Sequence, residues 1–265
     1  PPYDNAGWTL AYQMGVRVDR ILDGYNGSFV RVDSELHPPA GTITQVPRPA
    51  GYLFTHEAND AFLAVNRLLA GGESIYWLTE DYSVGGKRWP EGTHYVPAGD
   101  ATLGQLQQLA RDVGLSFQAD ARAPEVEALQ LRPVRIALWD QYGGSAPSGW
   151  ARLVLEQFEF PYTVVYPKTL DAGNLAKSFD VLILVEDSTF STGEARLPRV
   201  VAPEYSDRAG GLTTGATVPQ LKTFLEAGGT VLAIGRSTTL ALHAGLRISN
   251  AVADLPNTKF YVPGS

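Results

Sequence analysis

The order of hydrophobic and polar positions divides the chain into a Pro- and Gly-rich beginning and two stretches in which strands and helices alternate. Residues 1–50 predict a linker that packs on a neighbouring element, because Pro and Gly interrupt every short apolar run there. Within this segment, Trp8–Met14 is apolar and aromatic, Ser28–Val32 fits a strand, and residues 37–51 predict a loop.

Residues 51–125 predict a small α/β region. Its best-marked element is a helix within residues 57–72, which carries an apolar stripe, polar Asn59 and Asp60 near its start and a pair of glycines at its end. The stripe consists of Phe62, Val65, Leu68 and Leu69. The remaining elements are strands at 51–54, 74–79, 93–97 and 115–119, a Gly-rich excursion at 80–92, and a helix at 103–113 that ends at Gly114. Residues 123–133 separate this region from the next.

Residues 130–265 predict a second α/β domain. Its strands are expected at 134–140, 162–166, 179–185 and 230–235, its helices at 149–158, 172–178 and 218–227, and a long loop at 188–214. Alternating strands and helices favour right-handed crossovers and a mostly parallel sheet covered on both faces. We therefore predict an α/β three-layer sandwich of the flavodoxin-like or class I amidotransferase-like kind.

The stretch from Ala227 to Gly245 is the place where such a domain would hold an active site. An apolar strand runs there into a sharp bend at Arg236 and Ser237 and then into a short helix, so the bend lies at the carboxyl edge of the sheet. The sequence GRSTT resembles the nucleophile elbow G-x-S-x-G, but its last glycine is a Thr, and no His follows beyond His243. Capping of the helix by Ser237 or Thr238 is favoured over a serine nucleophile.

Charged side chains follow the predicted strands at the same edge. Asp140 ends one strand, Glu186 and Asp187 end another, and Arg236 lies in the bend beside Ser237. Carboxylates at this edge could bind a sugar or a cation, while ion pairing with Arg236 is the simpler interpretation. These five residues are the candidate ligand crevice, and no catalytic residue is expected apart from Ser237 as a weak candidate.

Histidines, cysteines and aromatic residues add no cofactor site. The four histidines, His37, His56, His94 and His243, are scattered over different predicted elements without zinc-ligand spacing, and the chain has no cysteine. We therefore expect no metal and no cofactor in this chain. Five aromatic residues of the first region are expected to pack in the core or at an interface, with stacking on sugar or peptide as the alternative. They are Tyr76, Trp77, Tyr82, Trp89 and Tyr95.

The charge balance argues against nucleic acid and anionic membrane as partners. The net charge is −7 with a pI near 5.1, and lysines and arginines do not cluster. No apolar run approaches the roughly 20 residues that a membrane-spanning helix needs. The chain starts without Met and ends in YVPGS, so we expect a processed or excised piece of a longer protein.

Four stretches resemble a known family. The start PPYDNAGWTLAYQMGV is similar to the P-Y-D-x-x-x-W-T-L-x-x-Q-M-G-V segment that follows the catalytic domain in large bacterial zinc carboxypeptidases of the carboxypeptidase A type. The stretches EANDAFLAVNRLLAGG, WARLVLEQFEFPYTVV and FLEAGGTVLAIG resemble downstream regions of the same proteins, which end in a class I glutamine amidotransferase-like domain.

The resemblance implies a non-catalytic C-terminal module of a secreted or periplasmic zinc metallopeptidase. Zinc and the peptide-hydrolysing residues would belong to an upstream domain of the same polypeptide, which would also be the partner of this chain, together with peptide or cell-wall substrate. In class I amidotransferases a Cys occupies the elbow, where this chain has Gly235 or Arg236, so no glutaminase activity is implied. The alternatives are a degenerate serine hydrolase at Ser237 and a carbohydrate- or small-ligand-binding domain.

Overall fold

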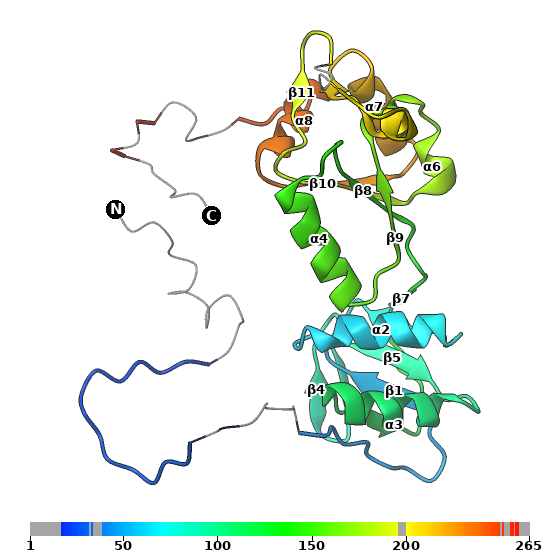
Figure 1. Cartoon of the computed structure of the whole chain (residues 1–265). Coiled ribbons are helices and arrows are strands. Elements are labelled where there is room, and N and C mark those ends of the chain that lie inside the picture. The colour runs from blue at the N-terminus through cyan, green and yellow to red at the C-terminus, as the bar shows by residue number, and fades with distance from the viewer. Residues whose placement is uncertain are drawn as a thin grey trace. The chain divides into compact units, whose positions relative to one another are not determined.

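A computed structural model of the chain describes residues 17–31, 33, 39–195, 200–249, 251, 255–256 and 258–259 (Figure 1). Described residues from 39 to 246 belong to one compact unit, and those on either side belong to a second. In the second unit, none of the described residues forms a helix or strand. The strand expected at Ser28–Val32 is therefore wrong for residues 28–31, where Phe29 is 68% and Val30 89% exposed. The expected apolar stretch Trp8–Met14 and His37 lie outside the described residues.

The first half of the larger unit contains a five-stranded antiparallel sheet with the order β6-β1-β5-β2-β7. Its core lies between the sheet and two helices and is built around Phe54, Leu68, Leu106 and Phe117, all of which are fully buried. The elements are β1 (Gly51–Phe54), α2 (Asp60–Ala70), β2 (Tyr76–Leu78), β5 (His94–Pro97), α3 (Thr102–Val113), β6 (Gln118–Asp120) and β7 (Ala128–Gln130). The four strands and two helices predicted for residues 51–119 are confirmed.

The buried side of α2 contains Val65 and Leu68 of the predicted stripe, with Leu63 in place of Phe62, and Leu69 is partly buried. Phe62 is 45% exposed, whereas Leu68 is completely buried. The buried side is formed by Ala61, Leu63, Ala64, Val65 and Leu68. Ala61 and Ala64 thus lie on the buried side of the helix, and Phe62 lies on its exposed side. The end of α3 follows the prediction, because Gly114 has a φ of +71° and adopts the left-handed conformation that glycine tolerates.

Two strand pairings were not predicted from the sequence. Residues 123–133 were expected to separate the two regions, but they contain β7, which pairs with β2 in the register Tyr76↔Gln130. The Gly-rich excursion at 80–92 contains the hairpin formed by β3 (Tyr82–Val84) and β4 (Lys87–Trp89). All three strands have only three residues, which is too short for a clear alternation of apolar and polar positions.

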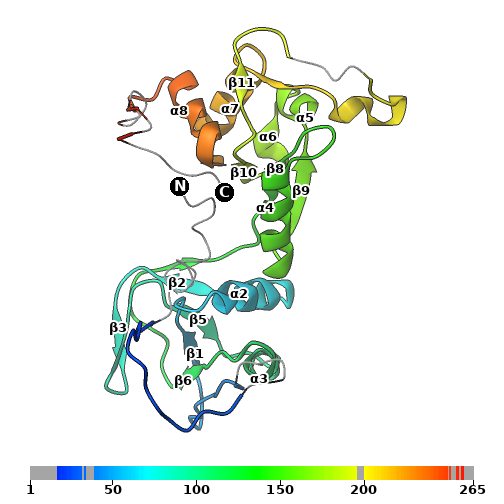
Figure 2. The same ribbon diagram turned by 60° about the vertical axis from the view of Figure 1, so that its left-hand side comes forward.

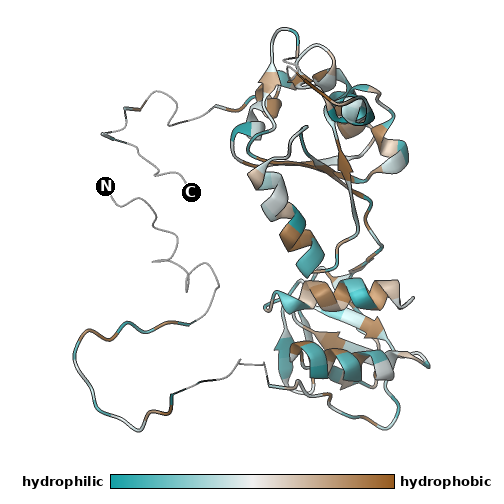
Figure 3. Cartoon of the chain, viewed as in Figure 1, coloured by the Kyte–Doolittle hydropathy of each residue, from teal (hydrophilic) through white to brown (hydrophobic). Residues whose placement is uncertain are grey.

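The second half of the larger unit contains a four-stranded parallel sheet with the order β13-β10-β8-β9. The strands are β8 (Ile136–Trp139), β9 (Tyr162–Val165), β10 (Val181–Leu184) and β13 (Thr230–Ala233), and the helices are α4 (Ala146–Gln157), α5 (Pro167–Asp171), α6 (Leu175–Ser178), α7 (Thr217–Glu226) and α8 (Leu240–His243). Figure 2 shows α4 alongside β8, while α5 and α6 both contact α7. β8 is buried along its whole length, and its apolar character is visible in Figure 3. The predicted parallel sheet is confirmed.

Local sequence explains where the helices depart from the prediction. The single helix expected at 172–178 is replaced by α5 and α6, because Gly173 and Asn174 between them have φ values of +74° and +56°. α4 starts at Ala146 rather than at Gly149, since the Ser145 side chain accepts a hydrogen bond from the backbone N–H of Ser148.

The predicted loop at 188–214 contains short elements. They are β11 (Phe190–Ser191), the 3-10 helix η2 (Pro203–Arg208) and β12 (Leu212–Thr213), with β11 and β12 paired in parallel. None of the helices in the described ranges is long and apolar enough to cross a membrane.

Candidate functional site

The carboxyl edge of the parallel sheet collects the charged residues that the sequence singled out. β8 is the first strand of this sheet in the chain, and its neighbours are β9 on one side and β10 on the other. The order of the strands therefore reverses direction at β8. In open α/β sheets, such a switch point leaves a crevice outside the strand ends. Asp140 follows β8 and Glu186 follows β10 at this edge, and Arg236 lies in η3 (Gly235–Thr239) after β13.

The bend after β13 has glycine at its most constrained position. Gly235 has a φ of +62°, and a Cβ atom there would overlap Oε2 of Glu186. The Glu186 carboxylate therefore occupies the space that a side chain at position 235 would need. A nucleophile at this position would have to adopt a left-handed backbone, which is strained for any residue with a side chain, and the Glu186 side chain would have to move.

Ser237 holds the bend together from inside. Its side chain is completely buried, its Oγ accepts a hydrogen bond from the backbone N–H of Ile234 at 2.8 Å, and it lies 2.9 Å from the carbonyl oxygens of Leu184 and Ile234. These contacts join η3 to the end of β10. His243 packs edge-on against Phe190, with ring centroids 5.9 Å apart.

Arg236 pairs with both acidic residues that follow β10. Its Nε donates to Oε1 of Glu186 at 3.2 Å, and its Nη2 lies 3.5 Å from Oδ1 of Asp187. The Ser145 hydroxyl donates to Oδ2 of Asp187 at 3.0 Å. The structure thus brings Glu186, Asp187 and Arg236 together as an ion-pair cluster, and all three side chains remain partly exposed to solvent.

Asp140 belongs to a different pair, which the sequence did not reveal. Its side chain is only 5% exposed, its Oδ1 accepts from the backbone N–H of Gln141 at 2.8 Å, and its Oδ2 accepts from Nη2 of Arg152. Arg152 lies on α4, twelve residues away from Asp140. The sequence shows that Arg152 lies on the first helix after β8. It does not show which face of that helix Arg152 occupies, so the pairing with Asp140 could not be predicted.

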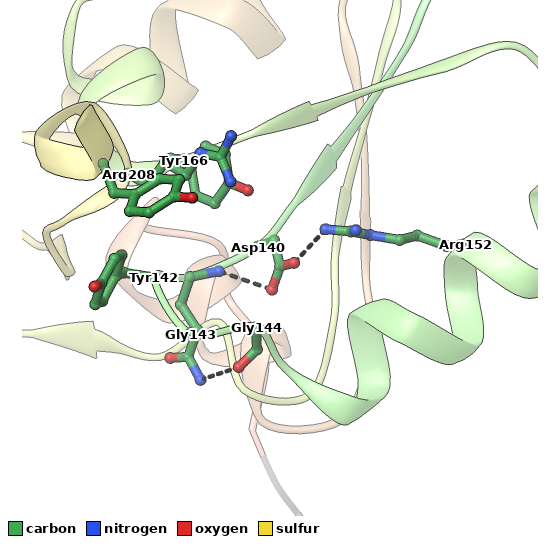
Figure 4. A pocket seen from close by; sticks show the side chains of 9 residues that line it. Asp140, Tyr142, Gly143, Gly144, Arg152, Tyr166 and Arg208 are labelled. Carbon is green, nitrogen blue, oxygen red and sulfur yellow. Dashed lines mark hydrogen bonds and ion pairs between the residues drawn. The ribbon is translucent and has the colours of Figure 1, made fainter. Parts of the chain in front are cut away.

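An open cavity of about 410 Å³ lies beside this pair (Figure 4). Apart from Asp140 and Arg152, its lining comes from the β8–α4 loop, the end of β9 and η2. The residues are Gln141, Tyr142, Gly143, Gly144, Tyr166, Tyr205 and Arg208. The contributions of Tyr205 and Arg208 were not predicted, because residues 188–214 were expected to form a loop. The sequence of a loop does not indicate which surface its side chains contact.

A second cavity, of about 420 Å³, lies at the switch point between β8 and β10. Trp139, Gln141 and Asp187 line it, together with residues around β11 and β12. Nε1 of Trp139 is buried and has no hydrogen-bond partner among the described residues.

The described histidines, His56, His94 and His243, are not grouped as metal ligands. His94 is buried and stacks on Phe54 at 4.7 Å between ring centroids, and burial together with nearby His56 lowers its pKa from 6.5 to about 4. His56 itself is exposed. Across the part of the chain that the structure describes, no three His, Cys, Asp or Glu residues are grouped to hold a metal ion. His37 lies outside that part.

The five aromatic residues of the first region have mixed positions. Trp89 and Tyr95 are buried beside Leu53 and Leu78, and Tyr76 and Tyr82 pack against the same cluster. Trp77 is 45% exposed. Core packing therefore accounts for four of these rings.

Comparison with known proteins gives no match to a family model, to a curated protein or to a solved structure.

Proposed function

We propose that this chain is a non-catalytic accessory α/β module from the C-terminal part of a zinc metallocarboxypeptidase-like protein, in which an upstream domain holds the zinc and hydrolyses the peptide. The family assignment and the secreted or periplasmic location follow from the resemblance of the four sequence stretches. The absence of catalysis in this part is supported by the bend after β13.

The observation that carries the proposal is the chemistry of that bend. The most constrained backbone position is Gly235, which has no side chain, and the nearby hydroxyl of Ser237 is buried among backbone groups. A serine nucleophile needs an accessible oxygen and a base within hydrogen-bond reach. Among the described residues, Ser237 Oγ hydrogen-bonds only to backbone atoms of Ile234 and Leu184, so the serine-hydrolase alternative lacks both requirements there.

We infer further that the second half has the flavodoxin-like or class I amidotransferase-like three-layer arrangement. In chain order, its strands are arranged 2-1-3-4, which is the order in which flavodoxin-like sheets begin. α4 on β8, and the group of α5, α6 and α7, would be its two outer layers.

The surface of α4 supports a role in contact with another domain. Trp150 is 69% exposed, Leu153 50% and Val154 52%, and their spacing places all three on one side of the helix. Grouped exposed apolar side chains are typical of surfaces that another protein part covers. The upstream peptidase domain is the partner that the proposal assigns to this side of α4.

Peptide hydrolysis by two lengths of chain tests this function. The 265-residue chain and a chain extended upstream through the expected peptidase domain are assayed on a panel of peptides that differ in the C-terminal residue, with and without zinc. We expect release of the terminal residue by the extended chain only. Hydrolysis by the 265-residue chain alone would contradict the accessory role.

A further inference from the structure

The cavity beside Asp140 has an unbalanced positive charge. Asp140 is neutralised by Arg152, with which it forms both an ion pair and a hydrogen bond. The other charged group in the lining is Arg208, and none of the described carboxylates lies within 4.0 Å of its guanidinium. The cavity therefore favours a ligand that carries negative charge.

Aromatic rings hold Arg208 in place. Its guanidinium carbon lies 5.5 Å from the ring centroid of Tyr166 and 5.0 Å from that of Tyr205. Figure 4 shows Arg208 against Tyr166 at the cavity, opposite the side occupied by Asp140 and Arg152. A guanidinium stacked on rings uses its faces and keeps the N–H groups at its edge available, and those groups match the two oxygens of a carboxylate or phosphate.

Tyr142 extends the aromatic surface of the same cavity. Its ring centroid lies 6.2 Å from that of Tyr205, at a tilt of 49°. Gly143 and Gly144 follow Tyr142, and a Cβ atom at either position would meet nothing within 4 Å, so the floor beside the rings is open. The space is suited to a flat or ring-shaped group that packs against tyrosine.

We propose that this cavity binds a small ring-containing ligand, such as a sugar, that carries one oxyanion. Arg208 binds the carboxylate or phosphate of the ligand, and Tyr142 and Tyr205 contact its ring. Asp140 orients Arg152 at the cavity wall. This inference goes beyond the accessory role, and it is tested by binding, so its failure is distinguishable from a failure in the hydrolysis experiment.

Titration of the ¹⁵N-labelled chain with four ligands, followed by NMR, separates the contribution of the ligand's oxyanion to binding from that of its ring. Glucuronate and glucose 6-phosphate carry both features with different oxyanions, glucose has only the ring, and inorganic phosphate only the charge. We expect one or both of the first two to shift the signals of residues around Tyr142 and Tyr166 at low salt. We expect glucose and inorganic phosphate to bind at least about tenfold more weakly, because each lacks one set of contacts.

Variants then assign the contacts. Arg208→Gln is expected to weaken binding of the charged sugar about tenfold or more, and Arg208→Lys to retain part of the affinity because it keeps the charge. Arg111→Gln on α3 removes an exposed arginine from the other half of the unit and is the matched control. The same NMR spectra show whether each variant is folded.

Several outcomes would overturn the proposal. They are equal affinity for glucose and glucuronate, equal affinity for inorganic phosphate and glucose 6-phosphate, unchanged affinity of Arg208→Gln, or no shifted signals with any of the four ligands. Binding of only one of the two charged sugars would support the proposal and identify the oxyanion.

Discussion

Gly235 and Ser237 lie two residues apart in the same bend, and each is fixed by a different physical requirement. Gly235 is favoured by its backbone φ of +62°, a conformation that residues with a side chain rarely adopt. Ser237 is required for its hydroxyl, which lies among backbone groups of Leu184 and Ile234 in a buried place. A sequence that resembles a nucleophile elbow is thus used to connect a strand to a helix.

Replacement of Ser237 by alanine tests the structural role. Ser237→Ala removes the hydroxyl contacts in a fully buried site, and we expect the free energy of unfolding to fall by about 1–2 kcal/mol. Urea denaturation measures this change. Thr238→Ala is the control, because Thr238 makes a comparable hydrogen bond to the carbonyl of Gly235 in an exposed place and is expected to cost less than about 0.5 kcal/mol. Equal stability of wild type and Ser237→Ala would contradict the structural role.

His94 predicts a pH dependence of stability. Its pKa is about 4 in the folded protein instead of the ordinary 6.5, so between these values the unfolded chain binds a proton that the folded chain does not. Stability should therefore decrease as pH falls from about 6.5 to 4, by roughly 2–3 kcal/mol from this group.

The matched variant for this pH dependence is His94→Leu, which has no titrating ring. Urea denaturation of both proteins at several pH values cancels the contribution of the carboxylates, since these are the same in both. The unfolding free energy of the wild type minus that of His94→Leu should decrease as pH falls from 7 to 4. A constant difference between pH 7 and 4 would show that His94 does not titrate as its burial implies.

Among the elements, α4 and its N-terminal cap contact two of the acidic residues of the candidate site, Asp140 and Asp187. Its first turn follows the Gly143–Gly144 pair, its Arg152 neutralises Asp140, and its cap Ser145 also donates to Asp187. The helix therefore positions groups on both sides of the switch point, one at the end of β8 and one after β10.

The N-terminal cap of α4 is open to a direct test. Ser145→Ala removes the cap and the contact with Asp187, and we expect a loss of about 1 kcal/mol in the free energy of unfolding. Ser145→Asn keeps a capping oxygen and should recover most of the loss. Thermal or urea denaturation gives the comparison. If both variants lost the same stability, capping would not be the cause.

At the scale of the whole molecule, the larger unit contains two main hydrophobic cores that have no buried residue in common. One surrounds Leu138 and the parallel sheet, and the other surrounds Leu106 and the antiparallel sheet. Each core is composed of residues close in sequence, so each half buries its own apolar surface.

Core substitutions should therefore act on one half at a time. Leu138→Ala and Leu106→Ala each truncate a fully buried side chain, and each is expected to destabilise its own half by about 2–5 kcal/mol. Native-state hydrogen exchange should show faster exchange in β8, β10 and β13 for the first variant, and in β1, β5 and β6 for the second. Equal acceleration in both halves for either variant would show that they unfold as one cooperative unit. The division of the chain into residues 1–50, 51–125 and 130–265 is a prediction.

Prediction from the sequence succeeded for the amphipathic helices and the apolar strands, and it failed for three short strands and for contacts between distant residues. The helices α2 and α3 were expected near their observed places because each has about three turns of amphipathic pattern. The short strands β3, β4 and β7 were missed, and α5 with α6 were read as one helix. The pairing of Asp140 with Arg152 was missed because the strand end and the helix face are related only through packing.

The sequence by itself determined the order of the longer helices and of the four parallel strands, because local periodicity and backbone preference depend on neighbouring residues. Only the tertiary structure decided that Ser237 is buried, that Asp140 pairs with Arg152, and that Arg208 lies against Tyr166 and Tyr205. These contacts join residues from separate loops and helices, and their distances depend on how the elements pack around the sheet.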